Sequence, residues 1–220
     1  MTQQTRTTPR RPGMQFSSQS TLLEDTAVMM REFVRQPTVM GAIAPSSVRL
    51  AEAVVAPLPA RGNPVVVELG PGTGAFTRVI QSRLNGRGRH IAVEINPRLA
   101  SLLSRRHPDV EVAQASAMQL KSILADHGVE QADLIISGLP WAALPEAFRD
   151  ATLDGVSAVL APGGVFTTFG YTWVRGTTRA RCFRRALGTH FEEVVTGRAV
   201  LRNLPPAFVY YARRPRLACV

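Results

Sequence analysis

The chain is poor in lysine, in cysteine and in long apolar runs. Of its 26 basic residues one is Lys121 and the other 25 are arginines. Two cysteines, Cys182 and Cys219, are too few for a disulfide framework or a zinc site, so reduced thiols in the cytoplasm are expected. No stretch approaches the roughly 18 to 20 apolar residues of a membrane span, and the polar N-terminus lacks the apolar core of a secretory signal. We expect a cytoplasmic protein that can lie on the inner face of a membrane without crossing it.

The composition suits a globular protein with an anionic partner. The chain has 220 residues, 45% of them hydrophobic, which is enough for one domain with a complete core. Its formal charge of +10 favours phospholipid head groups or nucleic acid, because a strongly positive surface attracts them electrostatically.

The N-terminal part is expected to differ from the rest. Residues 1–20 hold Thr, Gln, Ser and Arg and little that could be buried, which predicts a disordered basic tail. Apolar positions recur at helical spacing over residues 21–36 until Pro37 ends the pattern, which predicts an amphipathic helix. That helix either packs on the core or lies on a membrane. Residues 21–220 are expected to form a single domain.

Strand and helix patterns alternate along the rest of the chain. A helix capped by Ser46 or Ser47 precedes "VVVEL", and strand-helix units follow as far as "GGVFTTFGY" at residues 163–171. Two neighbouring strands, "FEEVVTGRAVLRN" and "AFVYYARR", then suggest an antiparallel hairpin. The pattern predicts an α/β, Rossmann-like fold with seven strands, a mostly parallel sheet, an antiparallel edge hairpin and helices on both faces.

A glycine loop follows the first strand of this sheet. "VVVELGPGTGAF" places Gly70, Gly72 and Gly74 between a strand and a helix, where missing β-carbons let a ligand approach the backbone. The loop also fits a dinucleotide fingerprint, with Glu94 at the end of the next strand as the ribose-binding acid. Glu68 would repel a pyrophosphate, whereas it would attract the ammonium and sulfonium groups of S-adenosylmethionine. The loop therefore predicts S-adenosylmethionine as the cofactor.

With "ELGPGTG" and Glu94 in this context, residues 65–170 resemble class I S-adenosylmethionine-dependent methyltransferases. The resemblance implies that Glu68 and the three glycines line the methionine part of the cofactor and that Glu94 holds the ribose hydroxyls. It places Ser116 and Ala117 beside the adenine, at a position where the family often has an acidic residue. Ser137, at the end of the fourth strand, completes the expected cofactor site. Ser116 still offers one hydrogen-bond acceptor.

The stretch "SGLPW" at residues 137–141 follows the fourth strand, whose end faces the methyl group in this family. "ELGPGTG" and "GLPW" also resemble ribosomal RNA adenine dimethyltransferases, more distantly. Enzymes that methylate base amines need an Asn or Asp here to hold the amine hydrogens. This chain has Gly138 at that position. A nucleic acid substrate is therefore not expected.

An aliphatic amine suits this apolar stretch better. At pH 7 such an amine is protonated, and freeing its lone pair costs roughly 4 to 5 kcal/mol, a cost that an apolar site lowers. Leu139, Pro140 and Trp141 are expected to form the apolar wall. Trp141 and Tyr171 are expected to follow the developing positive charge through cation–π contacts. Tyr171 is also the best candidate for a general base, because the histidines are expected at the far edge of the sheet.

A closer resemblance is to bacterial phosphatidylethanolamine N-methyltransferases of the soluble, membrane-associating kind. It rests on "PTVMGAIAPSS" from Pro37, "RNLPPA" from Arg202, "SGLPW" and "FGY", and it covers roughly residues 33–213. It implies methylation of the head-group amine of phosphatidylethanolamine or a related amino lipid, with "GAIAPSS" closing over the cofactor and Ser46 contacting it. Two alternatives stay open: an N-methyltransferase of a small amine or peptide in specialised metabolism, and a noncatalytic membrane-binding protein that retains the cofactor pocket.

The segment after Tyr171 departs from those lipid enzymes. From Arg175 to Arg185 it holds five arginines and no acidic residue. One interpretation is a solvated helix face. The other is a clamp in which Arg179, Arg181 and Arg184 bind a lipid phosphate. No metal site is predicted, and the sequence does not predict the oligomeric state.

Overall fold

The computed structural model describes residues 47–216. The expected tail over residues 1–20, the expected helix over residues 21–36 and Ser46 lie outside the described residues. The serine that caps the helix ahead of the sheet is Ser47, whose hydroxyl accepts a hydrogen bond from the N–H of Leu50 at 3.2 Å.

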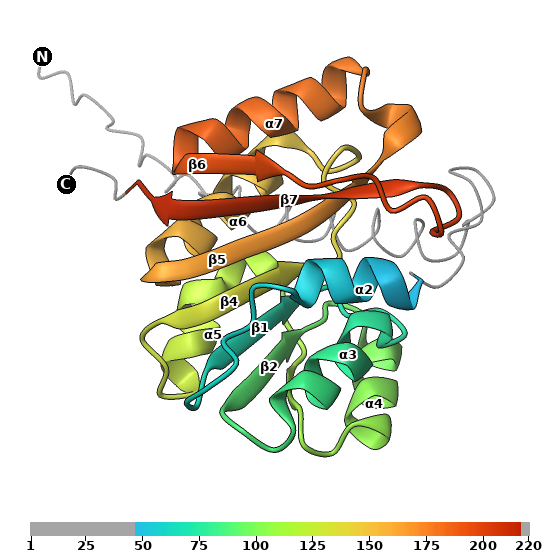
Figure 1. Cartoon of the computed structure of the whole chain (residues 1–220). Coiled ribbons are helices and arrows are strands. Elements are labelled where there is room, and N and C mark those ends of the chain that lie inside the picture. The colour runs from blue at the N-terminus through green and yellow to red at the C-terminus, as the bar shows by residue number, and fades with distance from the viewer. Residues whose placement is uncertain (1–46, 217–220) are drawn as a thin grey trace, which may run out of the picture.

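The described residues form one seven-stranded sheet in the order β3-β2-β1-β4-β5-β7-β6 (Figure 1). Every neighbouring pair is parallel except the two that involve β7, which runs antiparallel to both β5 and β6. The strands are β1 Val65–Leu69, β2 Arg89–Val93, β3 Glu111–Ala113, β4 Ala132–Ser137, β5 Leu160–Tyr171, β6 Phe191–Thr196 and β7 Ala207–Pro215. The predicted mostly parallel sheet with an antiparallel edge hairpin is confirmed.

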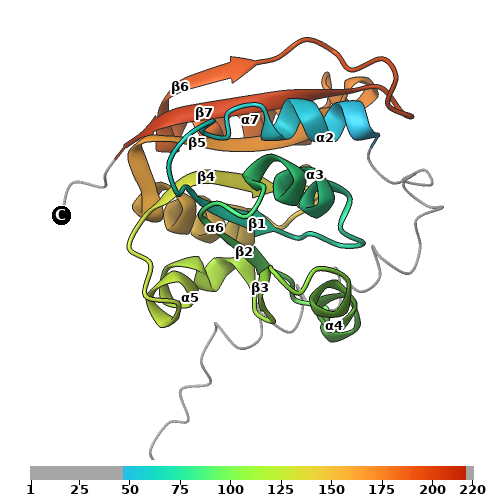
Figure 2. The same ribbon diagram turned by 60° about the horizontal axis from the view of Figure 1, so that its bottom comes forward.

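Helices cover both faces of the sheet, as Figure 2 shows. One face packs against α2, α3 and α4, and the other packs against α5, α6 and α7. The helices are α2 Val48–Val55, α3 Ala75–Leu84, α4 Pro97–Arg106, α5 Leu120–Asp126, α6 Glu146–Val159 and α7 Thr178–His190, with short 3-10 turns η1 Ala117–Gln119 and η2 Thr172–Val174.

The central strands are apolar on both sides because both faces are covered. In β1, Val67 and Leu69 join the core under α5 to α7, while Val66 packs on the α2 and α3 side. Glu68 shares the face of Val66 because side chains alternate along a strand. The sequence therefore places one carboxylate inside an otherwise apolar layer, directly before the glycine loop.

The connection between β6 and β7 is tied to the start of α2. Asn203, which is 4% exposed, accepts a hydrogen bond from the N–H of Ser47 at 2.9 Å and donates one to the carbonyl of Pro205 at 2.7 Å. The hydroxyl of Tyr211 donates to the carbonyl of Ala53 at 2.8 Å. These contacts hold α2 against β5 and β7. No helix in residues 47–216 is long and apolar enough to cross a membrane.

Candidate active site

The glycine loop joins β1 to α3 and has an unusual backbone. Gly70, Gly72 and Gly74 have φ angles of +68°, +57° and +88°, in the left-handed region that side chains disfavour. Gly74 also caps α3, and a β-carbon there would lie 3.2 Å from the side chain of Leu103. The loop thus presents bare backbone at the start of a helix.

Glu94 follows β2 and is tied to this loop. One of its carboxylate oxygens accepts a hydrogen bond from the N–H of Gly72 at 3.1 Å, and the other accepts one from the N–H of Asn96 at 2.9 Å. The side chain is buried, and burial raises the pKa of Glu94 above its ordinary value, while the backbone donors oppose the rise. The carboxylate is therefore fixed beside the loop, at the place where the sequence predicts the ribose-binding acid.

Glu68 lies beneath the loop with none of its surface exposed. Oε2 accepts a hydrogen bond from the hydroxyl of Thr77 at 2.7 Å, and Oε1 has no hydrogen-bond partner. His90 Nε2 lies 3.2 Å from Oε2, within ion-pair distance but without the angle of a hydrogen bond. The Gln81 amide nitrogen lies 2.9 Å from His90 Nδ1, so Nε2 is the ring nitrogen that faces the carboxylate.

This cluster of Glu68, Thr77, Gln81 and His90 corrects one expectation. The histidines are expected at strand starts and connections on the far edge of the sheet; His90 does stand at the start of β2, but its side chain is 2% exposed and packs beside Glu68. The β1–β2 register pairs His90 with Val66, so its ring reaches one step along the same face to Glu68. The sequence also gave no role to Thr77, although its position in the first turn after Gly74 places it next to the loop.

The stretch after β4 packs against the glycine loop. A β-carbon on Gly138 would lie 2.6 Å from the carbonyl oxygen of Gly70, and a β-carbon on Gly70 would lie 2.8 Å from the side chain of Leu139. The N–H of Gly138 donates to the carbonyl of Leu69 at 2.8 Å. The two loops therefore meet through backbone and Leu139, and no polar side chain can stand at Gly138 without displacing Gly70. Pro140 is half-buried beside them.

Trp141 differs from the expected open aromatic wall because its ring is 3% exposed. It stacks on Phe183 of α7 with ring centroids 4.9 Å apart and meets Phe166 of β5 edge-on at 5.9 Å. Its Nε1 donates to the hydroxyl of Ser137 at 3.0 Å, and Ser137 is itself fully buried. Trp141 thus belongs to the core on the α5 to α7 side of the sheet, and its hydrogen bond to Ser137 fixes the end of β4.

Tyr171 lies half-buried at the end of β5, on the α2 and α3 side of the sheet. Its ring meets Phe169 edge-on at 5.6 Å, and Phe169 meets Phe76 of α3 in the same way at 5.7 Å. Burial raises the pKa of the Tyr171 phenol, so it stays protonated at neutral pH. A protonated phenol is a hydrogen-bonding group and an aromatic face rather than a ready base.

Ser116 and Ala117 follow β3 and are both buried. Ser116 caps η1: its hydroxyl accepts a hydrogen bond from the N–H of Met118 at 3.4 Å, and the Gln119 side chain accepts one from the N–H of Ser116 at 3.4 Å. This reciprocal capping box was readable in the spacing of Ser116 and Gln119. The hydroxyl therefore already has a structural partner.

The arginines of the predicted phosphate clamp lie exposed along α7. Arg181 donates to the carbonyl of Gly176 at 3.0 Å, whereas Arg184 donates to the hydroxyl of Thr196 at 2.9 Å. Arg179 has no hydrogen bond or ion pair within residues 47–216. These contacts point the two guanidinium groups at different neighbours, and the clamp stays a prediction.

The loop and its two acids fit S-adenosylmethionine. Three glycines with positive φ leave room for a ligand against the backbone, and the Glu68 side chain lies buried beneath that backbone. A positively charged ligand suits this end of the sheet because the two carboxylates lie on either side of the loop. Within residues 47–216 no group of three His, Cys, Asp or Glu side chains is placed to hold a metal ion.

Comparison with known proteins agrees with this geometry. Residues 66–164 match a family described as a methyltransferase domain. An ornithine lipid N-methyltransferase from Singulisphaera acidiphila is 35% identical over 194 residues, which cover 87% of this chain and 97% of that protein.

Solved structures share the fold at lower identity. Fibrillarin from Aeropyrum pernix, with natively bound S-adenosylmethionine, has a TM-score of 0.58 and 19% identity and covers 74% of both chains. Human methyltransferase-like protein 13, in complex with S-adenosylhomocysteine, has a TM-score of 0.59 and 17% identity and covers 79% of this chain and 84% of that one. The chain belongs to the class I S-adenosylmethionine-dependent methyltransferases.

Proposed function

We propose that this methyltransferase acts on the head-group amine of an amino lipid, with an ornithine lipid and phosphatidylethanolamine as the two substrates to test first. The observation that carries the proposal is the carboxyl end of β4, where Gly138 packs on the carbonyl of Gly70 and leaves no side chain to hold a base amine. The identity to an ornithine lipid N-methyltransferase extends over nearly the whole of that protein, which supports a lipid substrate.

The cofactor contacts follow from the loop. The backbone of Gly70, Gly72 and Gly74 would accommodate the methionine part, and Glu94 would accept hydrogen bonds from the ribose hydroxyls. Glu68 would not touch the cofactor, since it is fully buried, but its charge beneath the loop favours a cationic ligand. Ser116, Ala117 and Ser137 would border the remainder of the site through their backbone. When bound, the cofactor supplies a methyl group activated by its sulfonium.

The chain itself must provide an uncharged amine. A primary amine with a pKa near 10.4 is protonated at pH 7, and an environment without water disfavours the ammonium form. Leu139 and Pro140 would supply that apolar surface beside the glycine loop. Positioning of the amine against the methyl group would contribute much of the rate enhancement.

Tyr171, at the end of β5, would be the polar side chain that faces the amine. Because its phenol is protonated at neutral pH, it would accept a hydrogen bond from the amine through its oxygen, or face the developing cation with its ring. Trp141 would act indirectly, by fixing the backbone of Leu139 and Pro140 from the core side.

The test offers labelled S-adenosylmethionine to the protein together with total lipid, total RNA and a set of small amines. Label in an amino lipid is expected, and purified ornithine lipid and phosphatidylethanolamine then identify the head group. Label only in small amines or peptides, or only in RNA, would contradict the proposal. Cofactor binding without turnover on any amine would also contradict it and would favour a noncatalytic role. The Glu94→Ala variant is the control for cofactor-dependent label.

A further inference from the structure

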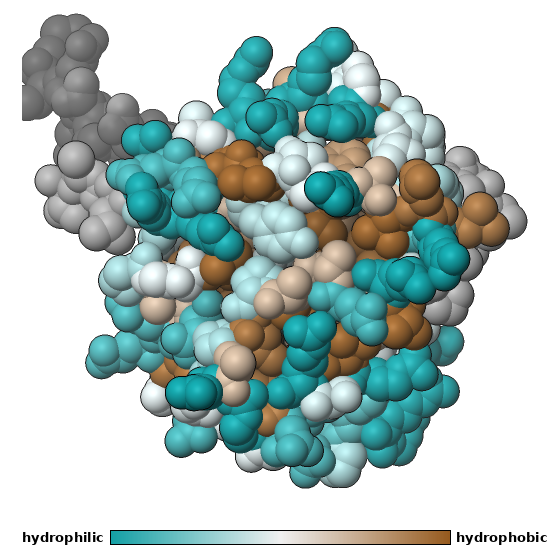
Figure 3. All heavy atoms as spheres, in the orientation of Figure 1, coloured by the Kyte–Doolittle hydropathy of each residue, from teal (hydrophilic) through white to brown (hydrophobic). Residues whose placement is uncertain are grey.

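Several large hydrophobic side chains are exposed on the surface of the molecule. Within residues 47–216 these side chains are Val48 at 60%, Trp173 at 60%, Val195 at 46%, Leu201 at 75% and Leu204 at 78% exposed. Figure 3 shows hydrophobic atoms gathered at the right of the view, where the β6–β7 connection and α2 lie. Large hydrophobic side chains that are exposed on neighbouring segments are typical of a surface that contacts a membrane or another protein.

Hydrogen bonds bring together the segments that carry four of these side chains. Asn203 lies between Leu201 and Leu204 in the sequence and binds the N–H of Ser47, the residue before Val48. Thr172 donates to the carbonyl of Pro206 through both its N–H and its hydroxyl, at 2.9 and 3.2 Å, which brings the adjacent Trp173 to the same loop. We call Val48, Trp173, Leu201 and Leu204 the docking face. Val195, in the edge strand β6, lies outside it.

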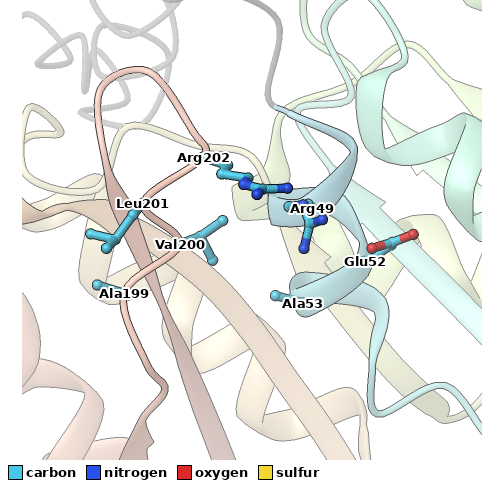
Figure 4. A pocket seen from close by; sticks show the side chains of 7 residues that line it. All are labelled: Arg49, Glu52, Ala53, Ala199, Val200, Leu201 and Arg202. Carbon is cyan, nitrogen blue, oxygen red and sulfur yellow. The ribbon is translucent and has the colours of Figure 1, made fainter.

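Arginines accompany the docking face. A groove of about 720 Å³ runs between α2 and the β6–β7 connection, and Arg49 and Arg202 are among the residues that line it. Figure 4 shows their guanidinium groups close together, while the Glu52 carboxylate points away from them. Neither guanidinium has a hydrogen bond or an ion pair within residues 47–216. Two guanidinium groups side by side repel each other, so an anion between them would be stabilised.

We propose that the docking face inserts its leucines into the interface of an anionic phospholipid bilayer, with Arg49 and Arg202 against the lipid phosphates. Apolar side chains flanked by arginines suit the boundary between acyl chains and charged head groups. The two guanidinium groups beside the leucines favour an anionic bilayer over an uncharged apolar partner. The inference rests on the proposed lipid substrate and names the surface that would bring the site to it.

The docking face lies next to the candidate active site. Tyr171 pairs with Ala207, and Ala207 pairs with Val200 at the floor of the groove, so the groove is two strands away from Tyr171. Two strand spacings are roughly 10 Å. A bilayer held at Leu201 and Leu204 would thus keep lipid head groups within reach of the end of β5.

The first test measures cosedimentation of the whole protein with vesicles of phosphatidylcholine and phosphatidylglycerol. Changing Leu201 and Leu204 together to Asp is expected to weaken binding at least about tenfold, because both leucines lose their apolar contact with the bilayer. The matched control is Val195→Asp, which adds a charge at an exposed apolar position outside the docking face and should bind as the unaltered protein does. Equal binding by the double leucine variant, or equal loss in the control, would overturn the proposal.

The second test addresses the arginines. Changing Arg49 and Arg202 to Gln should weaken binding to vesicles that contain phosphatidylglycerol by about tenfold or more and leave binding to pure phosphatidylcholine vesicles unchanged. The competing site is the pair Arg181 and Arg184 on α7, which is tested by reversing both charges. If that reversal abolished binding while the Arg49 and Arg202 variant bound fully, the contact would belong to α7 and the proposal would fail.

Activity separates this proposal from the proposed function. A short-chain amino lipid dissolved as monomers reaches the site without a bilayer, so the leucine variant should methylate it at the rate of the unaltered protein. Vesicle binding through the docking face without methylation of any lipid would overturn the lipid substrate and leave the surface standing. Lipid methylation together with full vesicle binding by the leucine variant would overturn the docking face and leave the lipid substrate standing.

Discussion

Gly138 lies so close to Gly70 that a methyl group on Gly138 would come within 2.6 Å of the Gly70 carbonyl oxygen. The glycine at position 138 therefore has two consequences. It leaves no polar side chain to hold a base amine, and it lets the chain after β4 pack directly on the glycine loop. The two loops that border the candidate site touch through backbone, and the position of one fixes the position of the other.

Changing Gly138 to Ala should therefore damage both stability and cofactor binding. The added methyl must displace the glycine loop, and overpacking of this kind costs about 1 to 3 kcal/mol of unfolding free energy. Urea unfolding and calorimetric titration with S-adenosylmethionine would measure the two effects.

The control for this change is Gly188→Ala in α7, where a β-carbon meets nothing within 4 Å. It should stabilise the protein by about 0.5 to 1 kcal/mol, because alanine favours a helix over glycine. Unchanged cofactor affinity in the Gly138 variant would show that the two loops move independently.

Trp141 should behave as a core residue. Trp141→Ala removes a buried ring stacked on Phe183 and is expected to cost about 3 to 5 kcal/mol of unfolding free energy. Trp141→Phe keeps a ring but loses the hydrogen bond to Ser137, a loss of about 1 kcal/mol.

Steady-state kinetics of the Phe variant would separate support from direct contact. We expect KM for the cofactor and kcat to stay close to those of the unaltered protein, since the backbone of Leu139 and Pro140 is retained. A large fall in kcat without a fall in stability would instead give Trp141 a direct contact with the reacting amine.

The fold and the loop were predictable from local patterns, whereas contacts across the sheet were not. Alternating strands and helices predicted the sheet, and "ELGPGTG" predicted the glycine loop between a strand and a helix. The burial of Trp141 depends on α7, which packs against it from more than 40 residues away in sequence, and no local pattern shows that. The position of His90 depends on the β1–β2 register in the same way.

The contact between Glu68 and His90 should couple the two residues energetically. Both side chains are buried and face each other at 3.2 Å, so changing one leaves the other without its neighbour. A double-mutant cycle with Glu68→Gln and His90→Gln is expected to give a coupling energy of about 0.5 to 3 kcal/mol in urea unfolding.

Thr77→Val supplies the comparison for that cycle, because it removes only the hydroxyl that donates to Glu68. It should weaken cofactor binding through the loop and leave the His90 contact in place. Strict additivity of the Glu68 and His90 changes would mean that the 3.2 Å approach carries no interaction.

Glu94 should make cofactor affinity depend on pH. Burial raises the pKa of Glu94 above the ordinary value of 4.5. Without cofactor, the folded protein therefore favours the protonated form more than the unfolded chain does. The carboxyl group then adds stability at low pH that is lost as the pH rises through the raised pKa. Cofactor binding has the opposite sign, because ribose hydroxyls donate to the charged form. Affinity should therefore fall as the pH drops from neutrality through the raised pKa.

Calorimetric titration with S-adenosylmethionine across this acidic range would measure the dependence. Glu94→Gln should bind about ten- to a hundredfold more weakly at neutral pH, as expected when a hydrogen bond to a charged group is lost, and its affinity should be nearly flat with pH. The control is Glu111→Gln on β3. The Glu111 carboxylate forms an ion pair with Arg89 at 2.6 Å and does not contact the glycine loop. Burial opposes but does not outweigh that pairing, which lowers the pKa of Glu111. The Glu111 variant should keep the pH dependence of the unaltered protein. If Glu94→Gln kept it too, another group would titrate with cofactor binding and the ribose contact of Glu94 would be wrong.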